Sequence, residues 1–452
     1  MNKFFETIQN IWKIKELRER ILFTLALLAV YRIGSFIVLP GVNSAKLESA
    51  VSNNNADLIG LINTFTGGAF NQAAIFALGI MPYITASIIV QLLGFAVPYF
   101  QKLQSKEGES GRKKLTQITR LLTVFITLVQ GGGYLTYLNS LGAVHDSLPP
   151  TIFWAANIII LSPGTFLAMW LGEKITDRGI GNGVSLLITI GIIATLPRSF
   201  ITEVISRFNG GGFFILLLEL AVLFFVVLAT VLIVQGVRRI PIQFAKRMVG
   251  RSHSNMPAAG NRDYIPLKVN ASGVMPIIFA QAIMFLPVTI SQWVSRGGTP
   301  GNFLMSLSDW KSIPYNIIFF LLVVVFTYVY TALLVNPQQY AEYLKRQNAF
   351  IPGIKPGKNT QDFIDSLTTR VTLPGSIFLG LISILPAVIA AFGVNDAFAL
   401  FFGGTSLLIL VAVVLDTLQQ IESYLLMRKY DGLVKSGRIK GRSGMQTIGA
   451  GM

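Results

Sequence analysis

Three ionisable residues lie inside long apolar stretches of the sequence, where they could couple the movement of an ion to that of a solute. These residues are Arg32, Glu219 and Asp416. A charged side chain inside a membrane is costly and usually marks an ion pathway or pairs with another polar group. The three lie in different stretches, so we favour polar contacts at helix ends or between helices over a transport site.

The residue types that enzymes use for catalysis form no recognisable site. The chain has no cysteine, which excludes disulfides, thiolate metal sites and cysteine nucleophiles. Its two histidines, His145 and His253, are predicted on opposite sides of a membrane and cannot share a site. The segment 357–359 lacks the first glycine and the hydroxyl residue of a phosphate-binding loop, and the glycines of 179–183 follow a helix instead of a strand. We predict that the protein is not an enzyme and has no metal site and no cofactor.

Ten long apolar stretches must position whatever side chains act. About 20 helical residues cross a hydrocarbon core of ~30 Å, and most of the stretches have that length. With 52% hydrophobic and only 13% charged residues, the chain is predicted to be one polytopic membrane domain. The fifth stretch is short unless its helix continues past Pro197. The stretches are residues 21–39, 73–97, 117–138, 151–171, 183–196, 213–235, 271–292, 314–335, 373–392 and 400–420.

The positive charge lies mainly on alternate connections between these stretches. Of the 37 Lys and Arg residues, 31 lie on one alternating set and 5 on the other, and Arg32 lies inside the first stretch. Such an excess marks the cytoplasmic side, so both termini are predicted to be cytoplasmic. The net charge of +16 would also attract ribosomal RNA or an acidic protein surface, although orientation alone explains any single basic loop.

The connections carry three further signals. Residues 58–70 are too polar to span lipid and too apolar for an ordinary loop, so we interpret them as a re-entrant half-helix that lines a cavity. An amphipathic helix on the outer surface is the alternative. The basic loops 236–270 and 336–372 each have enough chain for a hairpin that projects beyond the membrane. The tail 432–452 is predicted to be disordered.

Several long strings resemble the SecY family, the protein-conducting channels of the bacterial Sec translocon. LAVYRIGSFIVLPGV (28–42) is similar to the first transmembrane segment of that family, and FTGGAFNQAAIFALGIMPYITASIIVQLL (65–93) to its plug and second helix. The other matching strings are WLGEKITDRGIGNGVSLLI (170–188), RRIPIQFAKR (238–247), YIPLKVNASGVMPIIFA (264–280), IPGIKPGKNT (351–360) and FGGTSLLI (402–409). They follow the order of the family over about residues 14–442, which is more specific than any single motif.

The resemblance implies a fold and a function. The fold would be all-α, a polytopic membrane protein of ten transmembrane helices in two pseudo-symmetric inverted halves, residues 1–208 and 209–452, with a re-entrant plug. The protein would be the pore-forming subunit of a translocase in the cell membrane. It would pass unfolded secretory polypeptides and release transmembrane segments sideways into lipid. Implied partners are SecE and SecG, the SecA ATPase, the ribosome, and secretory and membrane-protein substrates.

The resemblance also implies four groups of site residues. The pore ring maps onto Ile80, Ile84, Val184, Ile188, Ile278 and Ile409. The plug includes Asn63, Thr64, Phe65, Thr66, Gly67 and Gly68. Candidate polar contacts at the lateral gate are Thr85, Gln91, Asn182, Asn270 and Gln281. The surface expected to dock SecA or the ribosome carries Arg238, Arg239, Lys246, Arg247, Lys345, Arg346, Lys355 and Lys358.

Two details of these groups bear on mechanism. The ring pairs in the second and fifth helices are four residues apart, so each pair lies on one helix face. Lys355 stands where the family usually has arginine, which keeps the charge but loses the planar fork of a guanidinium. A secondary transporter of a small solute and a membrane assembly scaffold are the alternatives to a channel.

Overall fold

A computed structural model describes residues 12, 14–43, 46–47, 63–105, 108–145, 149–209, 212–244, 262–294, 306–307 and 309–435. Each of the ten predicted apolar stretches contains a helix. By length and composition, seven described helices could cross a membrane, and Met81–Gly94 and Met275–Met284 are shorter apolar helices. The prediction of a disordered tail over 432–452 was wrong for 432–435, which end the last described helix, and the rest of the tail lies outside the described residues.

The first half of the chain forms a connected set of helices. α7 packs against α5 and α8, while α2 and α9 both pack against α8. The fifth predicted stretch does continue past Pro197, which lies inside α9. The helices are α2 (Lys15–Gly34), α5 (Met81–Ala96), α6 (Pro98–Ser105), α7 (Gly108–Ser140), α8 (Pro150–Arg178) and α9 (Gly183–Asn209).

The second half contains five long helices and a small sheet. α13 packs between α11 and α15, and α17 contacts α10 and α15. The helices are α10 (Phe213–Gln235), α11 (Met275–Val294), α13 (Ile313–Leu334), α14 (Pro337–Arg346), α15 (Lys358–Ala391), α16 (Asp396–Ala399) and α17 (Gly404–Lys435). The strands are β1 (Val237–Phe244), β2 (Arg262–Lys268) and β3 (Ala349–Phe350).

The ends of two predicted stretches were wrong. The second was expected to be apolar helix from residue 73, but its helix starts at Met81, next to Pro82 in the first turn. Positive φ at Ala73 (48°) and Gly79 (52°) keeps the chain between them out of a helix. In the first stretch the helix ends at Gly34. The residues that follow pair with the irregular segment before α5, where Leu39 N donates to the Ala73 carbonyl at 2.7 Å.

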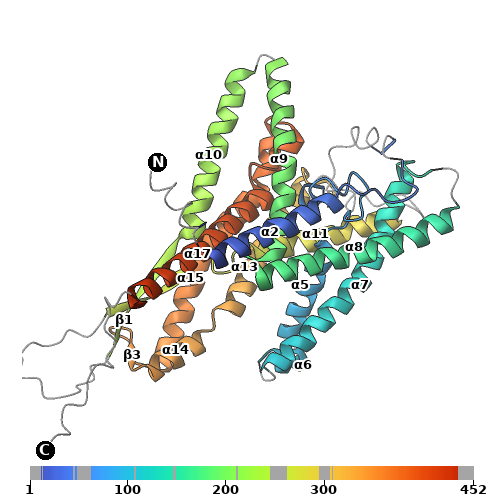
Figure 1. The fold of residues 1–452 in the computed structure, drawn as a ribbon. Coiled ribbons are helices and arrows are strands. Elements are labelled where there is room, and N and C mark those ends of the chain that lie inside the picture. Colours follow the sequence, from blue (N-terminus) through green and yellow to red (C-terminus); the bar gives the residue numbers. More distant parts are fainter. Residues whose placement is uncertain are drawn as a thin grey trace, which may run out of the picture.

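The two basic loops form one folded unit instead of two separate hairpins. β1 and β2 make the hairpin expected in 236–270, in antiparallel register. The prediction of a hairpin in 336–372 was wrong, because most of that loop is α14 and the first turns of α15. Its short strand β3 joins the free edge of β1, giving the order β2-β1-β3. Figure 1 shows β1 and β3 beside α14 at one end of the helices.

The two halves of the chain meet along two lines of contact. On one side α9 contacts α10, α16 and α17. On the other side α11 contacts α5 and α7. Figure 1 shows α9 and α10 standing side by side and projecting together from the other helices. The first line contains the chain connection from α9 to α10, whereas no described connection crosses the second line, so the second is where separation would be easier.

A buried ion network fastens the α9–α10 corner. Arg207 Nε lies 2.7 Å from Glu203 Oε1, and Arg207 Nη2 lies 2.7 Å from Glu219 Oε1. The same Nη2 donates to the Gly393 carbonyl at 2.8 Å, and Glu203 Oε2 accepts from Asn395 N at 3.0 Å. The network thus joins α9 to α10 and to the turn between α15 and α16. The interpretation of Glu219 as a helix–helix polar contact is confirmed.

We expect Arg207→Leu to lower the free energy of unfolding by about 3–5 kcal/mol, because it strands two buried carboxylates without their cation. The side chains of Glu203 and Glu219 are only 1% and 7% exposed. Lys113→Met, which breaks an exposed pair with Glu109 on α7, is the control and should cost about 0–1 kcal/mol. Thermal unfolding in detergent measures both, and equal losses would contradict a structural role for the network.

Candidate functional site

The six predicted ring residues come from four parts of the fold and lie in the same apolar interior. Ile84 is on α5, and Ile80 directly precedes that helix. Ile188 is on α9, Ile278 on α11 and Ile409 on α17. These five isoleucines are buried in one cluster, and Val184 packs against it.

Two of these side chains converge on a glycine of α8. A Cβ placed at Gly172 would lie 3.3 Å from Ile80 Cδ1 and 3.4 Å from Val184 Cγ2. The missing side chain therefore leaves room for both ring candidates at one level. Because α5 contacts α11 and α9 contacts α17, the remaining ring residues lie on neighbouring helices. None of the five isoleucines faces the exterior, as a lipid-facing residue would.

The described part of the predicted plug is compact. Asn63–Thr66 form one helical turn, and the chain then continues mostly as turns to Ile80. Gly68 N donates to the Asn63 carbonyl at 2.9 Å, and φ is +66° at Gly67 and +93° at Gly68. Residues other than glycine rarely adopt such backbone angles. Residues 58–62 lie outside the described residues, so the half-helix interpretation stays a prediction.

The predicted plug residues contact two helices of the first half, α2 and α9. Thr64, Phe65 and Thr66 are buried, and Phe65 belongs to the cluster that contains the ring candidates. A Cβ placed at Gly191 of α9 would clash with the Phe65 carbonyl and lie 3.0 Å from Gly67 N. Only a glycine at position 191 allows this close approach of two backbones.

Arg32, in the last turn of α2, binds the predicted plug segment directly. Its Nη1 donates to the Gly67 carbonyl at 2.6 Å, and its guanidinium lies 5.0 Å from the centre of the Phe36 ring. A hydrogen bond from a charged donor is about twice as strong as a neutral one. The interpretation of Arg32 as a polar contact is confirmed, but nothing in the sequence indicated that its partner would be the Gly67 carbonyl in the predicted plug.

The predicted gate residues do not form one polar cluster. Thr85 donates to its own helix at Met81, and Gln91 donates to Ser87 one turn earlier on α5. Asn182 caps the start of α9, where its Oδ1 accepts from the amides of the residues at 184 and 185.

The other two predicted gate residues, on the α11 side, are buried. Asn270 Oδ1 accepts from the Ser272 hydroxyl at 3.1 Å. Gln281 lines a small cavity between α11, α13, α15 and α17, which lies inside the second half and not between α5 and α11. The contact of α11 with α5 and α7 is therefore the described feature that bears on a lateral gate.

The described docking candidates lie on the folded unit made by the two basic loops. Its interior is apolar and includes Ile240, Leu267 and Ile364. Six of the candidates are exposed on it, namely Arg238, Arg239, Lys345, Arg346, Lys355 and Lys358. Lys246 and Arg247 lie outside the described residues. The sheet therefore brings cations from two distant loops onto one body.

This arrangement suits passage and closure better than catalysis. A narrow apolar constriction resists ions, because it does not hold a continuous column of water. Sequence reasoning missed two residues that contact the predicted plug. Arg32 donates to the Gly67 carbonyl, and Gly191 lies directly against the backbone at Phe65. The only signal of the first was its charge inside an apolar stretch, and a single glycine in a helix gives no signal of the second.

Comparisons with known proteins agree with this arrangement. A family model described as SecY matches residues 74–418. The protein translocase subunit SecY of Chlamydia muridarum is 39% identical over 459 residues, which cover 96% of this chain and 99% of that protein. A solved structure of a protein conducting channel has a TM-score of 0.63 at 18% identity, covering 94% of each chain. Sec61 in the canine ribosome–channel complex from the endoplasmic reticulum has a TM-score of 0.58 at 17% identity, also covering 94% of each chain.

Proposed function

Since this chain belongs to the SecY family and is the protein-conducting channel subunit of a Sec translocase, we propose that unfolded secretory polypeptides cross it through its apolar ring. It is a multi-pass membrane protein and a channel, not an enzyme. The proposal rests on one observation: five isoleucines from four parts of the fold are buried in one cluster. They are Ile80, Ile84, Ile188, Ile278 and Ile409.

The ring would act as a yielding seal. Branched aliphatic side chains exclude water and ions when the channel is empty. They also offer no hydrogen bonds to a passing extended chain, so the chain is not held in the constriction. The plug residues would close the same passage, since Phe65 is buried in the large apolar cluster that also contains the five ring isoleucines.

The contact of α11 with α5 and α7 would be the lateral gate. It has no covalent connection among the described residues, whereas the opposite contact has the buried network of Arg207. The two halves, residues 1–208 and 209–452, would then turn about the α9–α10 corner. An apolar segment of a substrate could pass between α5 and α11 into lipid, because polar contacts between membrane helices are worth only about 0.6–2 kcal/mol.

The partners and location follow from the same premise. We expect SecE and SecG as companion subunits, and SecA or the ribosome on the folded basic unit. The family relatives are translocase subunits, and one similar fold is that of Sec61 in a ribosome–channel complex. The charge asymmetry of the sequence favours the cell (cytoplasmic or inner) membrane, with the basic unit and both termini in the cytoplasm.

Charge reversal on the basic unit should weaken the binding of the partner that drives export. We expect Arg239→Glu together with Lys355→Glu to lower SecA-driven export roughly tenfold. The two cations would attract an acidic surface on the partner, whereas two carboxylates would repel it. Insertion of a simple membrane helix should change much less. Lys113→Glu on α7, which is also exposed but lies outside the unit, is the control. Equal loss of export and insertion would contradict the docking role.

Site-specific crosslinking tests the pore itself. A photoreactive residue at Ile278 or Ile409 should crosslink to a secretory chain stalled in transit. The same probe at Phe225, which is exposed on the outside of α10, should not. Crosslinks from position 225 but none from 278 or 409 would show that the chain follows another route.

A further inference from the structure

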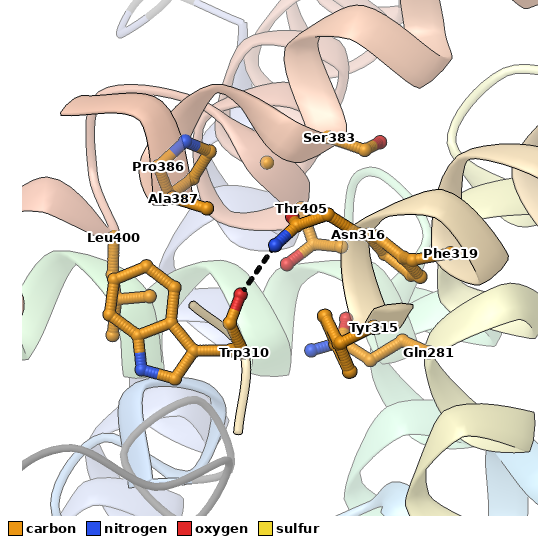
Figure 2. A pocket seen from close by; sticks show the side chains of 11 residues that line it. Gln281, Trp310, Tyr315, Asn316, Phe319, Ser383, Pro386, Ala387, Leu400 and Thr405 are labelled. Atoms are coloured by element: carbon orange, nitrogen blue, oxygen red, sulfur yellow. Dashed lines mark hydrogen bonds between the residues drawn. The ribbon is translucent and has the colours of Figure 1, made fainter. Parts of the chain in front are cut away.

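A small and mainly apolar cavity, lined by a few polar side chains, lies inside the second half among α11, α13, α15 and α17 (Figure 2). Its volume is about 20 Å³. A cavity needs roughly 10–15 Å³ on this measure to hold one water molecule, provided that it offers two to four polar partners. Among the described residues, the lining side chains that carry a hydrogen-bonding group are Gln281, Trp310, Tyr315, Asn316, Ser383 and Thr405.

Thr405 is the strongest sign that the cavity is occupied. Its side chain is 3% exposed, and its hydroxyl has no hydrogen-bond partner among the described residues. Most Thr hydroxyls on the other helices donate to the carbonyl four residues earlier, as Thr327 does to Val323. Thr405 is the second residue of α17 and has no helical carbonyl behind it. A buried hydroxyl without a partner is unfavourable, so a partner is required.

The other polar groups can complete the coordination of one water. Asn316 uses its Nδ2 to donate to the Trp310 and Ser312 carbonyls at 2.9 Å and 2.8 Å, which leaves its Oδ1 as an acceptor. Figure 2 shows the bond to Trp310 beside Thr405. Gln281 is buried, and its amide makes no hydrogen bond to another described residue. A water could accept from the Thr405 hydroxyl and donate to the Asn316 and Gln281 oxygens.

We propose that one ordered water molecule occupies this cavity and joins α11 to α13 and α17. Gln281 follows Ile278 by three residues on α11, and Thr405 precedes Ile409 by four on α17. Each is therefore about one helical turn from a ring residue. Gln281 and Thr405 both lie farther from the sheet than these ring residues do, because α11 runs away from the sheet and α17 runs back toward the sheet. The water would form a polar layer next to the apolar ring and would let α11 shift without breaking a direct side-chain bond.

The first test uses the sign of a stability change in the full chain in lipid nanodiscs. If the water is present, Thr405→Val removes a hydrogen-bonded group, and we expect the Tm to fall by about 2 °C or more. If the hydroxyl is unpaired, the same change removes an unfavourable group and the Tm rises. Ser406→Ala is the control, because the Ser406 hydroxyl is also buried and unpaired in the described chain but does not line the cavity. That change should not lower the Tm.

The second test needs no variant. Hydroxyl radicals formed from bound water by X-ray pulses label the side chains beside it. Phe319 lines the cavity and is 4% exposed, whereas Phe326 on the same helix is 9% exposed and does not line it. We expect Phe319 to be labelled several-fold faster than Phe326. A rise in Tm for Thr405→Val, or labelling of Phe319 no faster than that of Phe326, would overturn the proposal.

Discussion

Truncating one ring residue in each of four elements, with Ile80, Ile188, Ile278 and Ile409 all changed to alanine, is expected to make the resting channel conduct ions. Each change removes apolar groups worth about 0.8 kcal/mol per methylene, and a barrier lower by only ~1.4 kcal/mol passes about tenfold more ions. We therefore expect a rise of at least roughly tenfold in the resting conductance of a purified channel in a planar bilayer.

The matched control places the same number of truncations in the same parts of the fold. Ile88, Ile192, Ile277 and Leu408 lie on α5, α9, α11 and α17, and all are buried. Their change to alanine costs comparable packing energy, about 2–5 kcal/mol for each fully buried site. The channel should lose stability but stay closed. If both sets leak equally, the leak comes from general loosening, and the ring does not act as a seal.

Much of the fold followed from the sequence because lipid imposes simple rules. A segment that crosses a membrane must be long, apolar and helical, and cationic loops orient it. The required length made continuation past Pro197 the condition for a full fifth crossing, and α9 meets it. The hairpin in 236–270 was predicted from the length of that loop. The early end of the first helix and the late start of α5 were not, because they depend on pairing between residues 37–39 and 73–75. No local pattern encodes a pairing across that distance.

The site was predictable only in part. The buried isoleucines could be named because matched strings singled them out from many isoleucines of the same kind. The polar gate residues show the limit of that approach, since Asn182 caps a helix and Gln281 faces a cavity in the second half. Polar side chains in apolar helices signal a contact, but the partner depends on how the helices are rotated, which the sequence does not state.

The second large effect is expected from Arg32, which is the only charged residue in the apolar stretch 21–39 and donates to the Gly67 carbonyl of the predicted plug. Arg32→Leu should raise the resting conductance roughly 10- to 100-fold, since a hydrogen bond to a charged group is worth about 1.5–3 kcal/mol. Gly191→Ala should act in the same direction from the opposite side, because its new methyl group would push against the Phe65 carbonyl.

Arg20 provides the control for this contact. It lies on the same helix and also donates to a glycine carbonyl, that of Gly179 at 3.3 Å, but it is far from the plug. Arg20→Leu should leave the resting conductance unchanged in the same bilayer recording. If Arg32→Leu is as tight as the unmodified channel, the plug is held by its packing alone and the guanidinium serves only to bury a charge. A leak in Arg32→Leu that Gly191→Ala reproduces would instead mean that the closed state depends on the position of the segment 63–68 between α2 and α9.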